Sequence, residues 1–298
     1  MWNNSICLIM KSKCNLFLFL FICHSSFAQY NANFVSSSSA PLQNEIYSTV
    51  KMSRKGDHVK VKYFAAKDYN GASVYSRLNS WRKGKKIIAI SSGTYMTDCD
   101  PDLAKPVGLC IDNGNVVNNN LESNLDGLAI IYATGGMVAS NLKNGNLSIA
   151  DAGGKKTLDI RSPYQRQEFL SWARNNSATV FQTHLFYYGN KLTIGANSSP
   201  AKRERRFLAV GVDASGDVKH YLVNLSGANT LYQATIKVSN YLQNFEDVDN
   251  LTFLINLDTG CQDVFEFYKP NGTLDTRKGF FGKEPISQAT NLIVYYYE

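Results

Sequence analysis

Short β-type runs separated by hairpin-turn signals recur along most of this chain of 298 residues. Val59, Val61 and Tyr63 alternate with polar residues, as in a half-buried strand. Asn113-Gly114 and Ser215-Gly216 are typical of tight turns, which join antiparallel strands. Further strands are expected at 86–90, 107–111, 127–133, 178–188, 207–213, 217–224, 251–257, 263–269 and 291–297. The sequence therefore predicts a mixed or largely antiparallel sheet.

Two segments show helical signals. Ser162 to Gln165 has the form of a capping box with Pro163 at the first helical position. Residues 229–245 repeat apolar side chains at helical spacing, which indicates a helix packed on a core. With strands in the majority, the fold class is α+β, and no interior linker divides residues 45–298, so one domain is expected.

Residues 1–28 have the layout of a signal peptide, with Lys11 and Lys13 before a short apolar run and small residues ending at Ala28. The run is too short to cross a bilayer, which takes about 20 residues. We therefore expect an exported protein, periplasmic or secreted, without stable membrane insertion. Residues 29–44, which contain four consecutive serines, are expected to form a flexible leader.

The net charge is +7 and falls to +5 without Lys11 and Lys13. The densest basic runs, 82–86 and 202–206, are expected to be solvated loops. Because the chain has no nucleic-acid-binding module, we expect no nucleic-acid partner. The positive charge alone argues weakly for an anionic partner. The oligomeric state is left open.

Three cysteines lie beyond the expected signal peptide. An oxidising compartment favours a bridge between Cys99 and Cys110, which would close a short loop. Cys261 is then expected to be a buried small hydrophobe. The absence of paired CxxC motifs and His/Cys clusters argues against a zinc site.

The run from Leu251 to Phe267 places Asp258 directly after a buried-type strand. A carboxylate at such a strand end either takes part in chemistry or hydrogen-bonds to its own backbone as a turn former. The residues alone leave both roles open.

Four segments, taken in order, resemble the phosphodiester glycosidase (uncovering-enzyme-like) family. Residues 89–96 resemble its strand ending in an Asn-Gly-Gly-aromatic turn, and 180–185 its Thr-Gln-Ser-Gly-Pro-Leu strand. Residues 205–213 are similar to its Arg-Thr-Ala-Ile-Gly strand, and 256–260 to its Leu-Asp-Gly-Gly turn. The resemblance covers roughly residues 86–268.

The resemblance implies an exported hydrolase that releases a sugar from a sugar-1-phosphodiester. Such a reaction needs a cation for the diester, and a guanidinium can contact two phosphate oxygens at once. It also needs a carboxyl group to stabilise an oxocarbenium-like transition state or to move a proton. The implied catalytic residues are Asp258, Arg206 and His184. The implied substrate-binding residues are Arg205, Gln182, Thr183, Ser92, Gly93, Thr94, Thr259 and Gly260.

The chain departs from the family pattern where backbone freedom matters. Thr94 and Thr259 stand where the family has glycine, and Thr183-His184-Leu185 replaces Ser-Gly-Pro. A side chain at a glycine position narrows the approach of a ligand to the backbone. The alternative is therefore a non-catalytic relative that binds carbohydrate or another envelope component.

Histidines and acidic loops are weighed separately. His184 is either a proton shuttle or a hydrogen-bonded sheet residue, and His58 and His220 are expected at the surface. Asp98, Asp100 and Asp102 alternate as in a Ca²⁺ loop, but Pro101 and the missing distal glutamate favour a solvated turn. No cofactor or metal is expected.

Two further functions compete. Asp258-Thr259-Gly260 resembles the catalytic turn of aspartic proteases, but there is one copy and too little chain follows it for a second lobe. The other function is glycan binding by stacking on Tyr187, Tyr188 and Tyr295–Tyr297. The alternative for these tyrosines is that they are ordinary strand residues, which their β-propensity favours.

Overall fold

The computed structural model describes residues 30–65, 72–100, 102–144, 146–151, 154–196, 198–260, 263–278 and 286–298. The expected signal peptide and Cys261 lie outside these residues. Within them, the strands form three larger sheets and one separate hairpin, and all pairings are antiparallel. The α+β fold class is confirmed.

The largest sheet has seven strands, and the sequence predicts most of its centre. Its order is β1 (Val35–Leu42), β2 (Glu45–Ser53), β15 (Val218–Asn229), β14 (Arg203–Asp213), β16 (Val248–Leu257), β12 (Leu185–Tyr188) and β13 (Lys191–Leu192). The expectation of a flexible leader is wrong for 35–42, because β1 pairs along its whole length with β2. The buried Val35 and a hydrogen bond from the Tyr30 hydroxyl to the Tyr268 carbonyl also anchor this segment.

Two five-stranded sheets complete the framework. One has the order β6 (Asn115–Asn118), β5 (Cys110–Asp112), β11 (Thr179–Thr183), β7 (Gly127–Ile131) and β8 (Met137–Asn141). The other has the order β18 (Leu274–Lys278), β17 (Val264–Tyr268), β4 (Lys86–Ser92), β19 (Leu292–Tyr297) and β3 (Val59–Phe64). The hairpin pairs β9 (Asn146–Asp151) with β10 (Gly154–Asp159).

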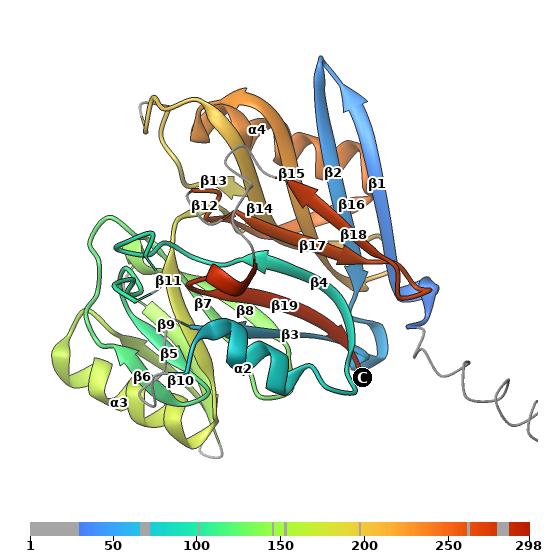
Figure 1. The fold of residues 1–298 in the computed structure, drawn as a ribbon. Coiled ribbons are helices and arrows are strands. Elements are labelled where there is room, and N and C mark those ends of the chain that lie inside the picture. The colour runs from blue at the N-terminus through green and yellow to red at the C-terminus, as the bar shows by residue number, and fades with distance from the viewer. Residues whose placement is uncertain are drawn as a thin grey trace, which may run out of the picture.

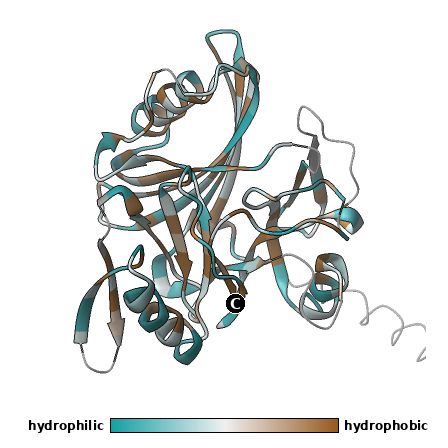
Figure 2. Ribbon diagram, turned by 90° about the vertical axis from the view of Figure 1, so that its left-hand side faces the viewer, coloured by the Kyte–Doolittle hydropathy of each residue, from teal (hydrophilic) through white to brown (hydrophobic). Residues whose placement is uncertain are grey.

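A shared core lies where the three sheets face one another, and each sheet carries one helix on its other face. The shared core includes Phe181, Phe253 and Tyr295. Three outer clusters pack under α2 (Val74–Trp81), α3 (Pro163–Asn175) and α4 (Leu231–Phe245). Figure 1 shows the helices at three separate places around the sheets, and Figure 2 shows hydrophobic residues concentrated in the central strands.

The helix boundaries test the capping signals. α3 begins at Pro163 as predicted, but Ser162 makes no side-chain cap, and Gln165 instead accepts a hydrogen bond from the Asp159 amide. The capping box belongs to α4, where the side chains of Thr230 and Gln233 each bond the other's backbone amide.

His220 contradicts its predicted surface position. Its side chain is buried in the core, with the residue 1% exposed, and Nδ1 lies 2.9 Å from the Tyr295 hydroxyl. Burial, followed by the charge of Arg54, lowers the pKa of His220 to about 3. The imidazole is therefore neutral at ordinary pH.

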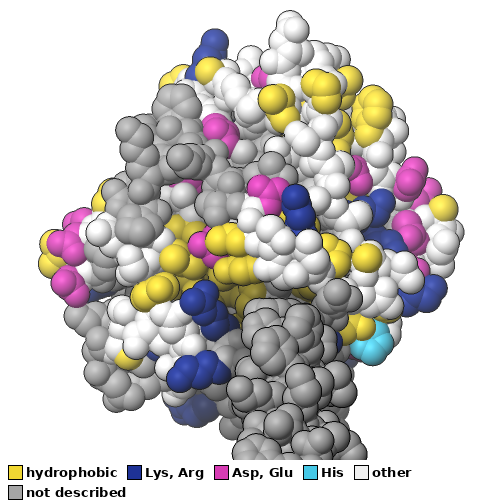
Figure 3. Space-filling view, turned by 45° about the vertical axis from the view of Figure 1, so that its right-hand side comes forward, with side chains coloured by type: hydrophobic (Ala, Val, Ile, Leu, Met, Phe, Trp, Pro, Cys, Tyr) yellow, Lys and Arg dark blue, Asp and Glu magenta, His cyan; other side chains and the backbone are white. Residues whose placement is uncertain are grey.

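The predictions for the tyrosines and for the overall charge distribution are confirmed, whereas the prediction for the basic run 202–206 is wrong. Tyr187, Tyr295 and Tyr296 are buried, which confirms them as ordinary strand residues. The run 202–206 is not a solvated loop, because most of it forms the start of β14. On the face drawn in Figure 3, basic and acidic side chains are interspersed, as the dispersed charge in the sequence predicts.

Candidate functional site

Three of the predicted site residues meet where β16 ends. The Asp258 amide donates to the Gly93 carbonyl over 2.8 Å, and Asp258 Oδ1 accepts from the Gly260 amide over 2.8 Å. Asp258 therefore forms the turn that its sequence context allowed. Gly93 is required here, because a Cβ would lie 2.2 Å from Asn291 Oδ1.

The Asp258 carboxyl group is half-buried and makes no ion pair with any described residue. Burial raises its pKa, and the hydrogen bond from Gly260 and the charges of Arg203 and Arg206 act in the opposite direction. A carboxyl group held in this way is easier to protonate than an exposed one. It could serve as a proton donor.

Arg203 is the cation that sequence reasoning missed. It begins β14, its charge acts on both Asp258 and Tyr95, and its side chain makes no hydrogen bond or ion pair within the described part of the chain. It is half-buried, so its guanidinium keeps some access to solvent. The basic run 202–206 contains three arginines, and only the fold shows which of them is unpaired.

Arg206 is the clearest correction. Its guanidinium Nη1 lies 2.5 Å from Asp263 Oδ1, and both side chains are 0% exposed. It also donates to the Val264 carbonyl (3.0 Å) and Asn224 Oδ1 (3.2 Å) and lies over the Phe265 ring. The expectation that Arg206 contacts a phosphate is wrong, because the group is enclosed in a structural ion pair.

Arg205 is also engaged within the protein. It donates from Nη2 to the Ala201 carbonyl (2.6 Å) and from Nε to the Asn229 carbonyl (3.4 Å). Burial and the neighbouring Arg203 lower the pKa of Arg205 to about 10. Its backbone contacts indicate a role in fixing the loop before β14.

The remaining predicted ligand contacts are buried and bonded. Thr94 Oγ1 donates to the Gln182 carbonyl (2.8 Å), Thr183 Oγ1 to the Asn256 carbonyl (3.1 Å) and Thr259 Oγ1 to the Glu204 carbonyl (3.2 Å). Ser92 Oγ accepts from the Val264 amide over 2.7 Å. These hydroxyls hold strands and turns together, and a ligand would have to displace those contacts.

Gln182 is the anchor of the loop before β7. Its Oε1 accepts from the Leu109 and Glu122 amides, and its Nε2 donates to the Glu122 and Leu125 carbonyls, at 2.7–3.0 Å. Gln182→Leu should therefore lower the free energy of unfolding by about 2 kcal/mol, because buried backbone groups would lose their partners. Urea titration measures this, with the exposed Gln167→Leu as control. Equal stability of the two variants would contradict the anchor role.

Tyr95 interacts with both Asp258 and His184. Its hydroxyl accepts a hydrogen bond from Asn256 Nδ2, and its ring meets the His184 imidazole edge-on at 5.2 Å between centroids. Burial, then the charge of Asp258, raises the pKa of Tyr95, so the phenol stays protonated. His184 thus packs against the tyrosine whose pKa burial and the charge of Asp258 raise.

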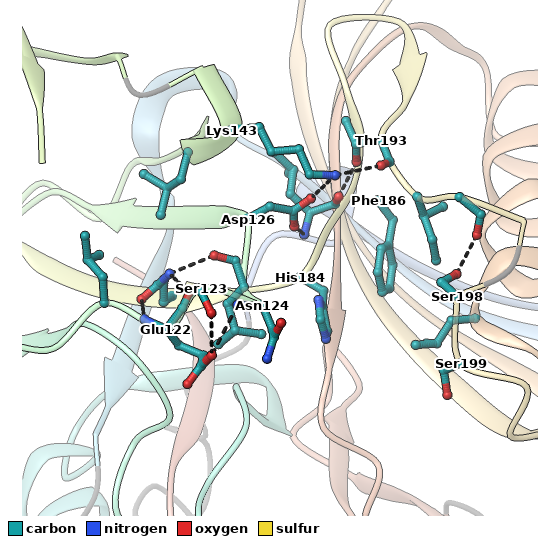
Figure 4. Close-up of a pocket in the computed structure, with 18 of the residues that line it drawn as sticks. Glu122, Ser123, Asn124, Asp126, Lys143, His184, Phe186, Thr193, Ser198 and Ser199 are labelled. Atoms are coloured by element: carbon teal, nitrogen blue, oxygen red, sulfur yellow. Dashed lines mark hydrogen bonds and ion pairs between the residues drawn. The ribbon is translucent and has the colours of Figure 1, made fainter. Parts of the chain in front are cut away.

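His184 faces a pocket of about 700 Å³. The predicted strand 178–188 is in fact broken at His184, where the chain passes from β11 in one sheet to β12 in another. Figure 4 shows the imidazole hanging into the pocket between Asn124 and Phe186. Its side chain has no hydrogen-bond partner among the described residues, and burial lowers its pKa.

Charged groups line the same pocket. Lys143 and Asp126 form an ion pair of 3.0 Å, and Asp126 Oδ1 also accepts from the Leu185 amide over 2.9 Å. Arg166, at the start of α3, has a buried Nε with no acceptor within the described ranges. Arg166 and Glu122 are therefore the lining charges without an ion-pair partner among the described residues.

The acidic loop at 98–102 and the cysteines differ in how far they agree with the sequence analysis. No group of three His, Cys, Asp or Glu residues that could hold a metal occurs in the part of the chain that the structure describes. Asp98 and Asp100 each cap the amide two residues on, at 2.9 Å, which confirms the solvated turn. Cys110 is a buried free thiol whereas Cys99 is disulfide-bonded, so the predicted Cys99–Cys110 bridge is wrong.

Comparison with known proteins gives remote structural similarity alone. No protein-family model matches the chain, and no curated protein sequence matches it. The catalytic domain of zebrafish N-acetylglucosamine-1-phosphodiester alpha-N-acetylglucosaminidase, auto-inhibited by its pro-peptide, is 13% identical, with a TM-score of 0.49 over 89% of this chain and 82% of that chain.

Two other solved structures are similar. A hypothetical protein from Synechocystis is 12% identical, with a TM-score of 0.46 over 89% of this chain and 62% of that chain. A putative exported protein from Burkholderia pseudomallei is 11% identical, with a TM-score of 0.43 over 85% and 74%. Similarities this remote assign neither an activity nor a site residue to the chain.

Proposed function

We propose that this protein is an exported hydrolase that cleaves a sugar from a sugar-1-phosphodiester at Asp258. The supporting observation is the half-buried Asp258 carboxyl group, which has a raised pKa and makes no ion pair among the described residues. The charge of Arg203, whose side chain has no partner among the same residues, acts on it. The resemblance of the 89–96 and 256–260 turns to the phosphodiester glycosidase pattern points the same way. Among the described residues, no helix is long and apolar enough to span a membrane.

In the proposed reaction, the bond between the anomeric carbon and the phosphate oxygen breaks and water adds to the sugar. Arg203 neutralises the diester, which is the role that the family resemblance implied for Arg206. Asp258 acts at the anomeric centre, as a proton donor or by stabilising positive charge. His184 is given no part in this step, because its imidazole faces a pocket that Asp258 does not line.

The test is release of N-acetylglucosamine from an N-acetylglucosamine-1-phosphodiester. Asp258→Asn should lower kcat at least a hundredfold, because removing a positioned acid or base typically costs that much. The matched control is Asp249→Asn, at an exposed position of the same strand, which should retain full activity. Arg203→Gln should raise KM for the diester. Equal turnover by Asp258→Asn and wild type would overturn the proposal.

A second candidate is a non-catalytic carbohydrate-binding protein. It is favoured by the bonded, buried side chains of Thr94 and Thr259, which occupy positions where the family has glycine. Binding of the diester by both wild type and Asp258→Asn, without turnover in either, would support this function and exclude the first.

A further inference from the structure

The pocket beside His184 offers several polar groups that the protein itself leaves unused. Its walls come from the 119–126 loop, the β11–β12 crossing, the segment after β13 and the start of α3. His184, Asn124 and Arg166 have side chains without hydrogen-bond or ion-pair partners among the described residues. His184 and Arg166 are half-buried, whereas Asn124 is exposed. Half-buried polar groups normally have partners, so the two left open around one cavity indicate a ligand.

The ion pairs around the pocket show which lining charges stay available to a ligand. Lys143 is paired with Asp126, and Glu122 Oε1 accepts from the Asn124 amide over 3.2 Å. Arg161, at the rim, is paired with Asp159 at 2.9 Å. Arg166 and Glu122 are the lining charges that make no ion pair among the described residues, and of these two the Arg166 guanidinium suits a carboxylate or phosphate of a ligand.

The rest of the lining indicates the body of the ligand. Apolar side chains form part of the walls, and hydroxyl and amide groups lie between them. The apolar members are Leu121, Leu125, Leu142, Leu185, Phe186, Ile194 and Leu231. A pyranose ring has apolar C–H faces and hydroxyl edges, which match such alternation. The volume of about 700 Å³ accommodates one or two rings.

We propose that this pocket binds an anionic sugar of one or two rings, with its carboxylate or phosphate on Arg166 and its hydroxyls on His184 and Asn124. A neutral imidazole can donate from one nitrogen and accept at the other, which suits a hydroxyl. Neither Asp258 nor Tyr95 lines the pocket, so this binding does not depend on hydrolysis at Asp258.

Isothermal titration calorimetry on the Asp258→Asn variant measures binding without turnover. Glucuronate, glucose 1-phosphate and glucose are the probes, and we expect both anions, or one of them, to bind at least tenfold more tightly than glucose. Preference between the two distinguishes a uronic acid from a sugar phosphate. Binding of all three probes with equal affinity overturns the proposal. So does the absence of binding at concentrations up to about 10 mM, the weakest affinity that the method resolves.

Variants locate the site. Arg166→Gln should weaken binding of the preferred anion at least tenfold and leave the affinity for glucose unchanged. Arg174→Gln, which removes an exposed charge from the same helix, should change neither affinity. Asn124→Trp, at an exposed loop position, should fill the pocket and abolish binding of the anion without affecting the thermal midpoint. Unchanged affinity in both Arg166→Gln and Asn124→Trp overturns the assignment, whatever the outcome of the hydrolysis assay.

Discussion

Replacing Arg206 by methionine is expected to lower the free energy of unfolding by about 3–5 kcal/mol, because it would leave Asp263 charged and unpaired in the interior. Both side chains are fully buried, and the pair joins β14 to the start of β17. The Asn224 and Val264 contacts of Arg206 would also be lost. Equilibrium urea unfolding followed by tryptophan fluorescence measures the change.

A double variant separates the charge effect from packing. Arg206→Met combined with Asp263→Leu removes both charges and should recover much of the loss, since an apolar pair of similar volume can replace a buried ion pair. Arg203→Gln, three residues away and half-buried, should change stability by less than about 1 kcal/mol. A stable Arg206→Met protein that no longer binds phosphodiester would contradict the structural role and restore Arg206 to the site.

The protein is expected to lose stability in mild acid through His220. Its folded pKa of about 3 lies below the ordinary value of 6.5, so between these values only the unfolded chain binds the proton. The contribution is fully present above pH 6.5 and is lost as the pH falls, by about 1.4 kcal/mol per unit. At pH 4 this amounts to about 3 kcal/mol.

Unfolding midpoints measured from pH 7.5 to pH 4 test this effect. His220→Gln cannot titrate and can still bond the Tyr295 hydroxyl, so its stability should fall less steeply with acid than that of wild type. His58→Gln, which removes an exposed histidine, is the control and should follow wild type. Parallel curves for His220→Gln and wild type would show that other groups cause the acid loss.

The strands whose pattern is decided by burial were predictable. Residues 86–90 and 251–257 are apolar runs, and both lie inside strands at the centre of a sheet. The break at His184 was not predictable, because strand-forming residues continue on both sides of it while the chain changes sheets. α2 is short, and its clearest signal is the Ser73 side chain that caps the Ser76 amide.

The site was predictable as far as local turn chemistry reaches. Asp258 and Gly260 meet because a turn former after a strand end fixes them locally. The Gly93 carbonyl that accepts from the Asp258 amide comes from a distant part of the chain, and the family resemblance, not the local pattern, included it in the predicted site. The roles of the arginines depend on distant partners. Asp263 lies 57 positions beyond Arg206, and nothing near Arg206 indicates that this carboxylate, and no other, would enclose it. The pocket likewise combines loops that are far apart in sequence.

The serine-rich strand β1 has a consequence for the margin of the largest sheet. It occupies the hydrogen-bonding groups along β2, whose own side chains include the buried Tyr47, Val50 and Met52. An outermost strand of mostly exposed serines, with Pro41 near its end, offers an unattractive template to another chain. β1 thus covers the sheet edge with hydrophilic side chains. A protein truncated to begin at Glu45 would expose the backbone hydrogen-bonding groups of β2 and would be prone to self-association.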